Sequence, residues 1–238
     1  MSVPQLPLAL RYPPDQRLES FFAAPAGAIA QLQALAQTRG ADWLYLAGAS
    51  GTGKTHLALA LCAAAAQAGR RPAYLPLLAA SGRLRDALDA LEGNDVVALD
   101  GLEAIAGHRD DEVALFDFHN RARSAGLNVL YTAQDVPGSL ALSLPDLRSR
   151  LSQNTRIVLN QLDDAARAEL LRDRARRRGL VLEETAIDWM LARTDRGLAS
   201  LLALLDRLDR ESLAAQRRIT VPFLRQVVES SSSIAGDA

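Results

Sequence analysis

The sequence predicts an α/β core built on a parallel β-sheet, followed by a small all-helical domain. Two observations lead to this fold class. Up to about residue 160, short apolar runs typical of buried strands alternate with helical patterns, and strands that alternate with helices form parallel sheets with right-handed crossovers. After residue 160, only helical patterns follow. A hydrophobic content of 49% supplies enough apolar material for a core and excludes a largely disordered chain.

The core is expected over residues 17–160, after an extended arm. The arm, residues 1–16, contains four prolines, which disfavour a helix there. The expected strands are 43–47, 73–77, 95–100 and 128–133. The expected helices are 24–39, 54–68, 81–91 and 110–125, the last of them amphipathic.

The helical domain is expected over residues 161–229. Asp163 can cap its first helix and Gly179 can end it, because aspartate accepts from free amide groups and glycine adopts the left-handed conformation that follows a helix. The other expected helices are 185–193, one with leucines at helical spacing from Leu198 to Leu208, and a short one capped by Thr220. Residues 230–238 are polar and rich in serine, which predicts a disordered tail.

Composition excludes several classes of protein. The net charge is -1, whereas a protein that binds nucleic acid chiefly through a basic surface would be strongly positive. The single cysteine, Cys62, excludes an intramolecular disulfide. No apolar run reaches the ~18 residues of a membrane helix, and no basic segment precedes the first apolar stretch as in a signal peptide. We therefore expect a cytoplasmic protein without a membrane partner.

One lysine stands among the 27 lysines and arginines, and this residue, Lys54, lies in a phosphate-binding motif. The run from Gly48 to Thr55 matches G-x-x-x-x-G-K-[ST], with a strand pattern before it and a helix pattern after it. Glycines let backbone N–H groups face phosphates, the lysine ammonium reaches the β- and γ-phosphates, and the threonine hydroxyl ligates Mg²⁺. The predicted nucleotide-binding residues here are Gly48, Gly51, Gly53, Lys54, Thr55 and the adjoining His56.

Asp100 ends the third expected strand and is the candidate acid of the Mg²⁺ shell, together with Thr55. Asp100 is therefore assigned to the nucleotide site, the metal and the catalytic set, although an aspartate at a strand end can also cap a helix. ATPases of this kind usually carry a second acid at the next position, where this chain has Gly101. Glu103 follows two residues later. The sequence thus supports nucleotide binding and leaves intrinsic hydrolysis open.

Several further stretches resemble the DnaA-like group of AAA+ ATPases, and within it the regulatory inactivators of the replication initiator. The stretches that carry this resemblance are Gln5–Leu10, the phosphate-binding motif, Val97–Gly107, Leu144–Leu151 and 205–223. The resemblance covers nearly the whole chain. It implies an AAA+ core with a helical lid, and a nucleotide, ADP or ATP, bound with Mg²⁺. It further implies that ADP is the functional form.

The resemblance also implies roles for two arginines. Arg150 matches the arginine finger, which reaches into the nucleotide site of a neighbouring subunit, and Arg148 is the nearby alternative. Arg196 matches the lid arginine that senses bound nucleotide. The strand 129–133 matches the sensor strand, with either Thr132 or Gln134 as its polar reader.

The arm carries Gln5, Leu6 and Leu8, which resemble a peptide that docks on the β sliding clamp. A glutamine amide would make fixed hydrogen bonds while leucines fill an apolar pocket, and Pro7 limits the unbound conformations. The alternative is an arm that packs on its own domain.

Together these features predict a regulatory AAA+ protein that negatively regulates replication initiation. Docked on the DNA-loaded clamp, and so on DNA indirectly, it would stimulate ATP hydrolysis by the initiator DnaA. A nucleotide-dependent homo-oligomer is also expected. The alternatives are a self-sufficient P-loop ATPase, such as a helicase loader or transposition helper, and a scaffold that works without the clamp. The arginine-rich segment 167–178 is either a solvated face or a contact for DNA or a partner.

Overall fold

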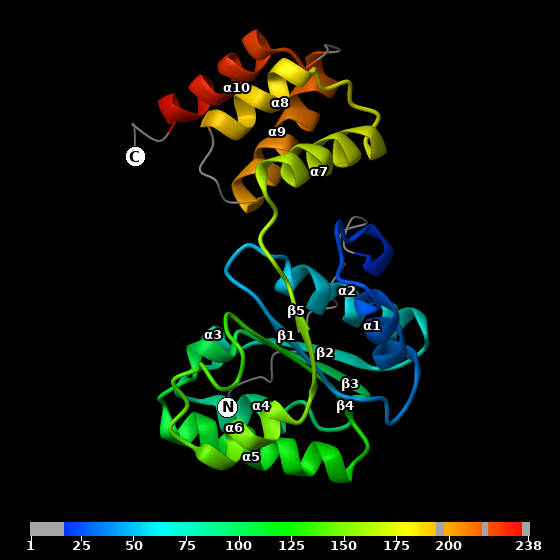
Figure 1. Cartoon of the computed structure of the whole chain (residues 1–238), viewed down its shortest axis with the longest axis vertical. Helices are drawn as coiled ribbons and strands as arrows, with labels where there is room; N and C mark the ends of the chain where they lie inside the picture. The colour runs from blue at the N-terminus through cyan, green and yellow to red at the C-terminus, as the bar shows by residue number, and fades with distance from the viewer. Residues whose placement is uncertain (1–16, 194–197, 216–218, 235–238) are drawn as a thin grey trace, which may run out of the picture. The chain divides into compact units, whose positions relative to one another are not determined.

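The computed structural model describes residues 17–193, 198–215 and 219–234. The chain forms two compact units, and the boundary between them follows Asn160. The first unit is a sheet with helices on both faces, and the second consists of helices (Figure 1). Among the described residues, no helix has the length and apolar character that crossing a membrane requires.

A five-stranded parallel sheet forms the centre of the first unit. Its strands are β1 Leu44–Ala47, β2 Pro72–Pro76, β3 Val96–Asp100, β4 Asn128–Ala133 and β5 Thr155–Val158. Their order is β2-β3-β4-β1-β5, and every neighbouring pair is parallel. The four predicted strands are confirmed. The edge strand β5 was not predicted, because only Ile157 of its four residues is buried and the run lacks the apolar pattern of the others.

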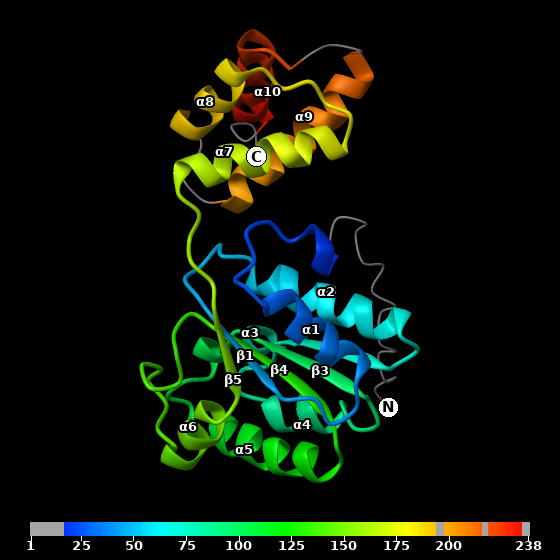
Figure 2. The same cartoon turned by 45° about the vertical axis from the view of Figure 1, so that its right-hand side comes forward.

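The helices of this unit cover both faces of the sheet. They are η1 Leu18–Ser20, α1 Ala28–Gln37, α2 Lys54–Gln67, α3 Leu77–Ala80, α4 Leu84–Asp89, η2 Leu102–Ala104, α5 Arg109–Ser124 and α6 Pro145–Ser152. Figure 2 shows α1 and α2 on one face, and α4, α5 and α6 on the other. The helix predicted over 81–91 is confirmed in a shorter form, as α4, and the preceding helix α3 was not predicted. Gly82, with φ +79°, separates the two helices.

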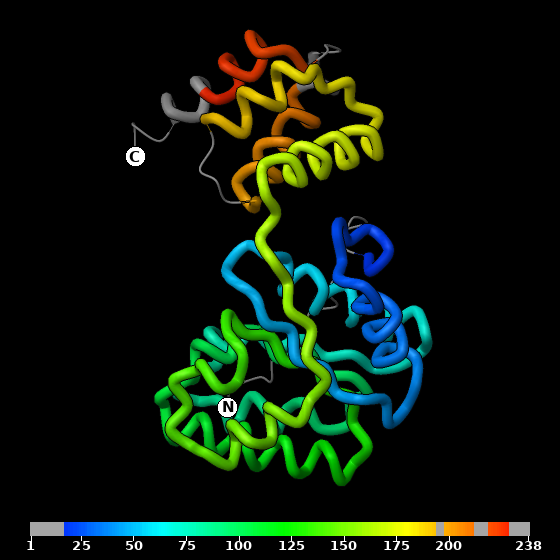
Figure 3. The backbone as a smooth tube through the Cα atoms, in the orientation of Figure 1, coloured from blue at the N-terminus to red at the C-terminus, as the bar shows by residue number. Residues whose placement is uncertain are grey.

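Two hydrophobic clusters, one on each face, hold these layers together. Val97 and Tyr131 belong to the cluster beneath α4, α5 and α6, whereas Ala98 and Leu130 belong to the cluster beneath α1 and α2. Successive strand residues point to opposite faces, so strands covered on both sides read as continuous apolar runs. The path of the chain from strand to helix and back to the sheet can be followed in Figure 3.

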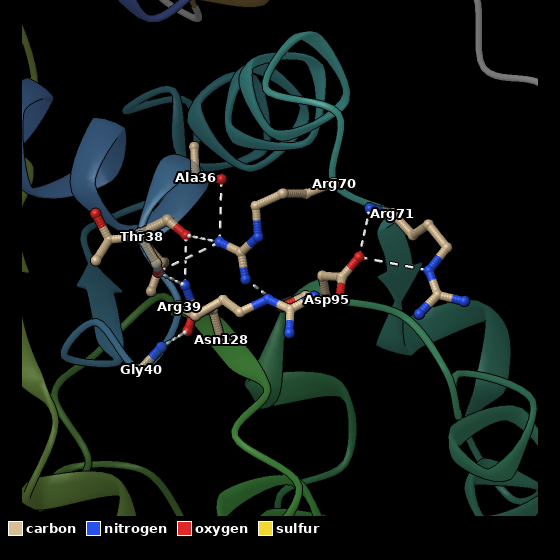
Figure 4. Close-up of polar contacts among 9 residues, drawn as sticks. Ala36, Thr38, Arg39, Gly40, Arg70, Arg71, Asp95 and Asn128 are labelled. Carbon is tan, nitrogen blue, oxygen red and sulfur yellow. Dashed lines mark hydrogen bonds and ion pairs between the residues drawn. The ribbon is translucent and has the colours of Figure 1, made fainter.

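Side chains also join α1 to the ends of the strands that lie away from the phosphate-binding motif. The Arg70 Nη1 donates to the carbonyl oxygens of Leu35 (3.0 Å) and Ala36 (3.1 Å), and its Nη2 donates to that of Asp95 (3.0 Å) (Figure 4). The Asn128 amide donates to the Leu35 carbonyl oxygen as well (2.7 Å). These donors satisfy carbonyl groups that the end of a helix leaves free, and they fix α1 to β3 and β4.

The second unit contains α7 Asp164–Arg177, α8 Glu184–Arg193, α9 Leu198–Ala215 and α10 Val221–Ile234 around its own apolar core. The predicted cap is confirmed, because the Asp163 carboxylate accepts from the Ala166 amide at 2.8 Å. Helix α10 runs to Ile234, so residues 230–234 are helical where the sequence predicts a disordered tail. Leu224 and Val227 are buried in the core and fix this helix, and serine is tolerated well enough for the helix to continue.

Candidate nucleotide-binding site

The phosphate-binding motif forms the turn between β1 and α2, at the carboxyl end of β1. Gly51 and Gly53 adopt φ values of +79° and +92°, a region that L-residues with a Cβ rarely occupy. At Gly48, a Cβ would lie 2.5 Å from the Leu159 carbonyl oxygen. The three predicted glycines are therefore required by the backbone path of this loop.

Lys54 begins α2 and folds back over the loop. Its side chain is buried, with 9% of the residue exposed, and its Nζ donates to the carbonyl oxygens of Gly48 (2.6 Å) and Ala49 (3.0 Å). Burial lowers the pKa of the ammonium, and the nearby carboxylates of Glu103 and Asp100 oppose that effect. The ammonium thus lies inside the loop, where phosphate oxygens could replace the two carbonyl groups.

Asp100, at the end of β3, is the polar centre of the site. Its Oδ2 accepts from the Thr55 hydroxyl (2.8 Å) and from the Tyr74 hydroxyl (2.8 Å), and its Oδ1 accepts from the Thr132 hydroxyl (2.5 Å). Thr55 and Asp100, 45 positions apart in the chain, are therefore brought together. Hydroxyl and carboxylate oxygens are ligands that Mg²⁺ prefers, so these two residues fit the metal that the sequence predicts.

Of the two candidate readers, Thr132 on β4 is the one whose side chain reaches Asp100, and Gln134 follows the end of this strand. Gln134 is exposed, and only its backbone amide enters the site, where it donates to Glu103 Oε2 at 3.1 Å. Tyr74 was missed in the sequence. The only signal in the sequence was the hydroxyl group of a tyrosine on the neighbouring strand β2, and this signal was weak.

The position after Asp100 takes a left-handed conformation, since Gly101 has φ +90° and its amide donates to the Thr132 hydroxyl at 2.9 Å. A residue with a Cβ is uncommon in this conformation, and the usual second acid is absent at this position. Glu103 lies on η2 instead. The charges of Glu103 and Asp100 both raise the pKa of Lys54, and the effect of Glu103 is the larger. The Glu103 carboxylate therefore contributes to the electrostatics of Lys54.

His56, in the first turn of α2, has its ring 5.6 Å from that of Phe21, measured between centroids. The Phe21 ring also covers Gly53, where a Cβ would lie 2.6 Å from its Cε2 atom. The sequence offered no signal for Phe21, because the residue lies more than thirty positions before the helix it contacts. The Phe21 ring therefore packs beside His56 and against Gly53 of the loop.

The two candidate arginines lie on α6 and differ in their surroundings. The Arg148 Nη2 donates to the Leu142 carbonyl oxygen at 2.5 Å, and the side chain is half-buried. Arg150 is exposed, and no hydrogen bond or ion pair joins its guanidinium to another residue in the described part of the chain. Arg148 is thus engaged within the fold, and Arg150 is available to a partner.

Arginines of the segment 167–178, which comprises most of α7 and the residue after it, form ion pairs with acids. Arg172 bonds Glu184, Arg178 bonds Asp206 at 2.6 Å, and Arg177 bonds Asp173 within the helix at 2.8 Å. This pairing favours a structural face over a nucleic-acid contact. Four predicted residues, namely Gln5, Leu6, Leu8 and Arg196, lie outside the described residues.

Comparisons with known proteins agree with this architecture. The model of the family described as IstB-like ATP binding protein matches residues 9–133, which is more than half of the chain, and the model described as "Hda, lid domain" matches residues 157–228. Domain III of the Thermotoga maritima replication initiation protein DnaA superposes with a TM-score of 0.74 at 19% identity, over 92% of this chain and 97% of that one. The chain belongs to the family of IstB-like ATP-binding proteins, and it shares the fold of DnaA domain III.

Other solved structures share the fold of this AAA+ protein. AMPPCP-bound DnaA from Aquifex aeolicus matches with a TM-score of 0.66 at 20% identity, over 82% of this chain and 65% of that one. The Thermotoga maritima RuvB Holliday junction branch migration motor matches with a TM-score of 0.63 at 20% identity, over 90% of this chain and 72% of that one. The predicted fold class, an AAA+ parallel-sheet core with a C-terminal helical lid, is confirmed.

Proposed function

We propose that this AAA+ protein is a cytoplasmic negative regulator of replication initiation. In this role it binds an adenine nucleotide with Mg²⁺, docks on the DNA-loaded β sliding clamp, and stimulates ATP hydrolysis by DnaA. The observation that carries the proposal is the match of residues 157–228 to the Hda lid. The resemblance of the sequence to the regulatory inactivators supports ADP as the working ligand.

Each part of the nucleotide site has a task in this function. Lys54 would exchange its two carbonyl partners for phosphate oxygens. Thr55 and Asp100 would hold Mg²⁺, which would supply positive charge to neutralise the phosphates. Thr132 holds the Asp100 carboxylate from the sensor strand. Arg196 is the proposed lid sensor. Because Gly101 replaces the usual acid, the bound nucleotide acts as a structural ligand rather than as the main substrate.

Arg150 acts as the arginine finger in the nucleotide site of the partner, DnaA. An arginine finger stabilises the charge that develops during phosphoryl transfer and contributes roughly 10³–10⁵ in rate. Its exposure and its lack of an ion pair among the described residues support this role. The ATP that is hydrolysed belongs to DnaA, which is thereby inactivated. The same arginine facing a second copy of the chain would give a nucleotide-dependent homo-oligomer.

The arm, residues 1–16, brings the protein to the clamp in this proposal. Gln5, Leu6 and Leu8 are proposed to bind the clamp, which places the protein on DNA without a basic surface of its own, in keeping with the net charge of -1. The paired arginines of the segment 167–178 agree with this indirect route to DNA.

The decisive experiment combines clamp, primed DNA and ATP–DnaA, and follows the loss of ATP with and without this protein. We expect acceleration by the wild type, loss of that acceleration in Arg150→Ala, and retention in Arg85→Ala, an exposed arginine paired with Asp117 on the α4–α5 side. If Arg150→Ala still binds the clamp and accelerates hydrolysis like the wild type, the proposal is wrong.

A self-sufficient ATPase is the second candidate, because Glu103 supplies a carboxylate three residues after Asp100 and its charge acts on Lys54. The match of the core to IstB-like ATP-binding proteins is compatible with it. Turnover without clamp or DnaA that Glu103→Gln abolishes would support this candidate and count against the first.

A further inference from the structure

Glu112 is a fully buried carboxylate in the first turn of α5, with 0% of the residue exposed. Four donors surround it. Its Oε1 accepts from the backbone amides of Gly107 (2.7 Å) and Ser143 (2.9 Å), and its Oε2 accepts from the Leu144 amide (2.7 Å) and the Ser143 hydroxyl (2.9 Å). A buried charge persists only when it is satisfied in this way.

The electrostatics show that these contacts bind an ionised group. Burial alone would raise the pKa of Glu112, but the hydrogen bonds from the Ser143, Gly107 and Leu144 amides and from the Ser143 hydroxyl outweigh it and lower the pKa. The carboxylate is therefore charged at neutral pH, and hydrogen bonds to a charged acceptor are stronger than those between neutral groups.

The donors connect two parts of the functional site. Gly107 ends the segment that follows Asp100 and η2, whereas Leu144 is the residue at which α6 begins. The leucine side chain makes no cap hydrogen bond, and the Glu112 carboxylate accepts from the backbone amide of Leu144. Arg150 lies six residues farther along α6, or about 9 Å at 1.5 Å per residue, so any tilt at the start of the helix moves it.

The neighbouring residue offers a matched comparison. Asp111 is also buried, with 4% exposed, and it accepts from two backbone amides, those of Gly82 (2.8 Å) and Leu84 (3.3 Å). These amides belong to the connection between α3 and α4. Two adjacent buried carboxylates thus hold different loops, and only one of these loops leads to Arg150.

We propose that Glu112 is the positioning residue for Arg150: its carboxylate fixes the segment 143–144 and so sets the direction in which α6 presents the finger to a partner. This inference rests on the proposed function, because it assumes that Arg150 acts on a neighbouring nucleotide site. Leu147 and Leu151 are the buried residues of α6. The start of the helix is held by the hydrogen bond from the Leu144 amide to Glu112.

The test compares Glu112→Gln with Asp111→Asn, each alone and combined with Arg150→Ala, in the clamp-dependent hydrolysis assay with ATP–DnaA. An amide offers one acceptor oxygen, so Glu112→Gln loses part of the anchor while keeping the size of the side chain. We expect Glu112→Gln to lower the stimulated rate by about 10- to 100-fold, since a displacement of 1 Å can cost 10²-fold. Asp111→Asn should stay within about twofold, because contacts that do not reach Arg150 act independently of it.

The combined variants separate positioning from general damage. If Glu112 acts through Arg150, adding Glu112→Gln to Arg150→Ala causes no further loss, because residues that act as a unit are not additive. A partner-independent readout is amide hydrogen exchange, which should become faster over residues 140–150 in Glu112→Gln and not in Asp111→Asn. Should Glu112→Gln fail to fold, Ser143→Ala removes one donor and should show the same pattern with a smaller loss.

Two results would overturn the inference while leaving the proposed function intact: a loss in Glu112→Gln no larger than in Asp111→Asn, or a further loss in the Arg150→Ala background. Wild-type stimulation that survives Arg150→Ala would instead overturn the proposed function and this inference with it.

Discussion

Gly48 occupies a place in the phosphate-binding loop that leaves no space for a side chain. A Cβ there would lie 2.5 Å from the Leu159 carbonyl oxygen, which is backbone and cannot rotate away. We expect Gly48→Ala to lower the free energy of unfolding by about 1–3 kcal/mol and to weaken nucleotide binding, because the loop must shift. Gly138→Ala, where nothing lies within 4 Å, is the control. Urea unfolding and titration with a fluorescent nucleotide measure both effects, and equal behaviour of the two variants would contradict the expectation.

Tyr74 adds a hydrogen bond to the acid of the proposed Mg²⁺ site. In Tyr74→Phe, Asp100 Oδ2 keeps only the Thr55 hydroxyl, which is also needed by the metal. A hydrogen bond to a charged group contributes about 1.5–3 kcal/mol, so we expect the Mg²⁺ concentration that half-saturates nucleotide binding to rise about 10- to 100-fold. Tyr45→Phe, which loses a hydrogen bond to the Asp135 carbonyl oxygen instead, should leave that concentration unchanged. A rise in both variants would mean that the hydroxyl has no specific link to the metal.

At the scale of elements, the contact between α5 and β4 contains a buried histidine. His119 Nδ1 lies 3.1 Å from the Tyr131 hydroxyl, and its ring meets that of Trp43 edge-on with centroids 4.7 Å apart. Burial, assisted by the positive charges of Arg123 and Arg150, lowers the pKa of His119 to about 4. The imidazole is therefore neutral in the folded protein at pH values where an unfolded histidine begins to take up a proton.

This difference makes stability depend on pH. Between the folded pKa of about 4 and the unfolded pKa of about 6.5, the unfolded state binds more protons, so the free energy of unfolding rises with pH through this window. Acidification from pH 6.5 to 5 should lower it with a slope of up to about 1.4 kcal/mol per pH unit. Urea unfolding at several pH values measures the slope. His119→Gln should reduce it and exposed His108→Gln should keep it; the reverse pattern would exclude His119 as the cause.

At the scale of the whole molecule, each of the two units contains its own apolar core. Leu205 is fully buried in the lid core, and Leu115 is fully buried in the core beneath α5. Replacing a buried leucine with alanine costs about 2–5 kcal/mol. We expect Leu205→Ala to speed amide hydrogen exchange within residues 161–234 and Leu115→Ala to speed it within 17–160, because each cavity weakens the unit that contains it. Loss of protection across both units in either variant would show that they unfold as one.

The success of sequence-based prediction followed the range of the interactions. The phosphate-binding motif is contiguous, and its strand and helix lie directly beside it, so Lys54 and Thr55 were found with their correct surroundings. The cap at Asp163 was predicted for the same reason. Strand β5 escaped prediction because an edge strand has one neighbour and needs little apolar content. Helix α10 continues through serines for which a disordered tail was predicted, because a leucine and a valine upstream are buried in the core and hold the helix there.

By itself, the sequence determined that this protein has a parallel α/β core, a helical second unit and a loop shaped for phosphates, since each follows from local periodicity or a contiguous motif. Only the tertiary structure decided that Thr132 rather than Gln134 holds Asp100, that Arg148 is engaged while Arg150 is free of ion pairs among the described residues, and that Glu112 anchors the start of α6. Those contacts are set by strand register and by the packing of α5 against α6. A shift of one residue along a strand would turn every side chain to the other face of the sheet, and no local pattern in the chain records that choice.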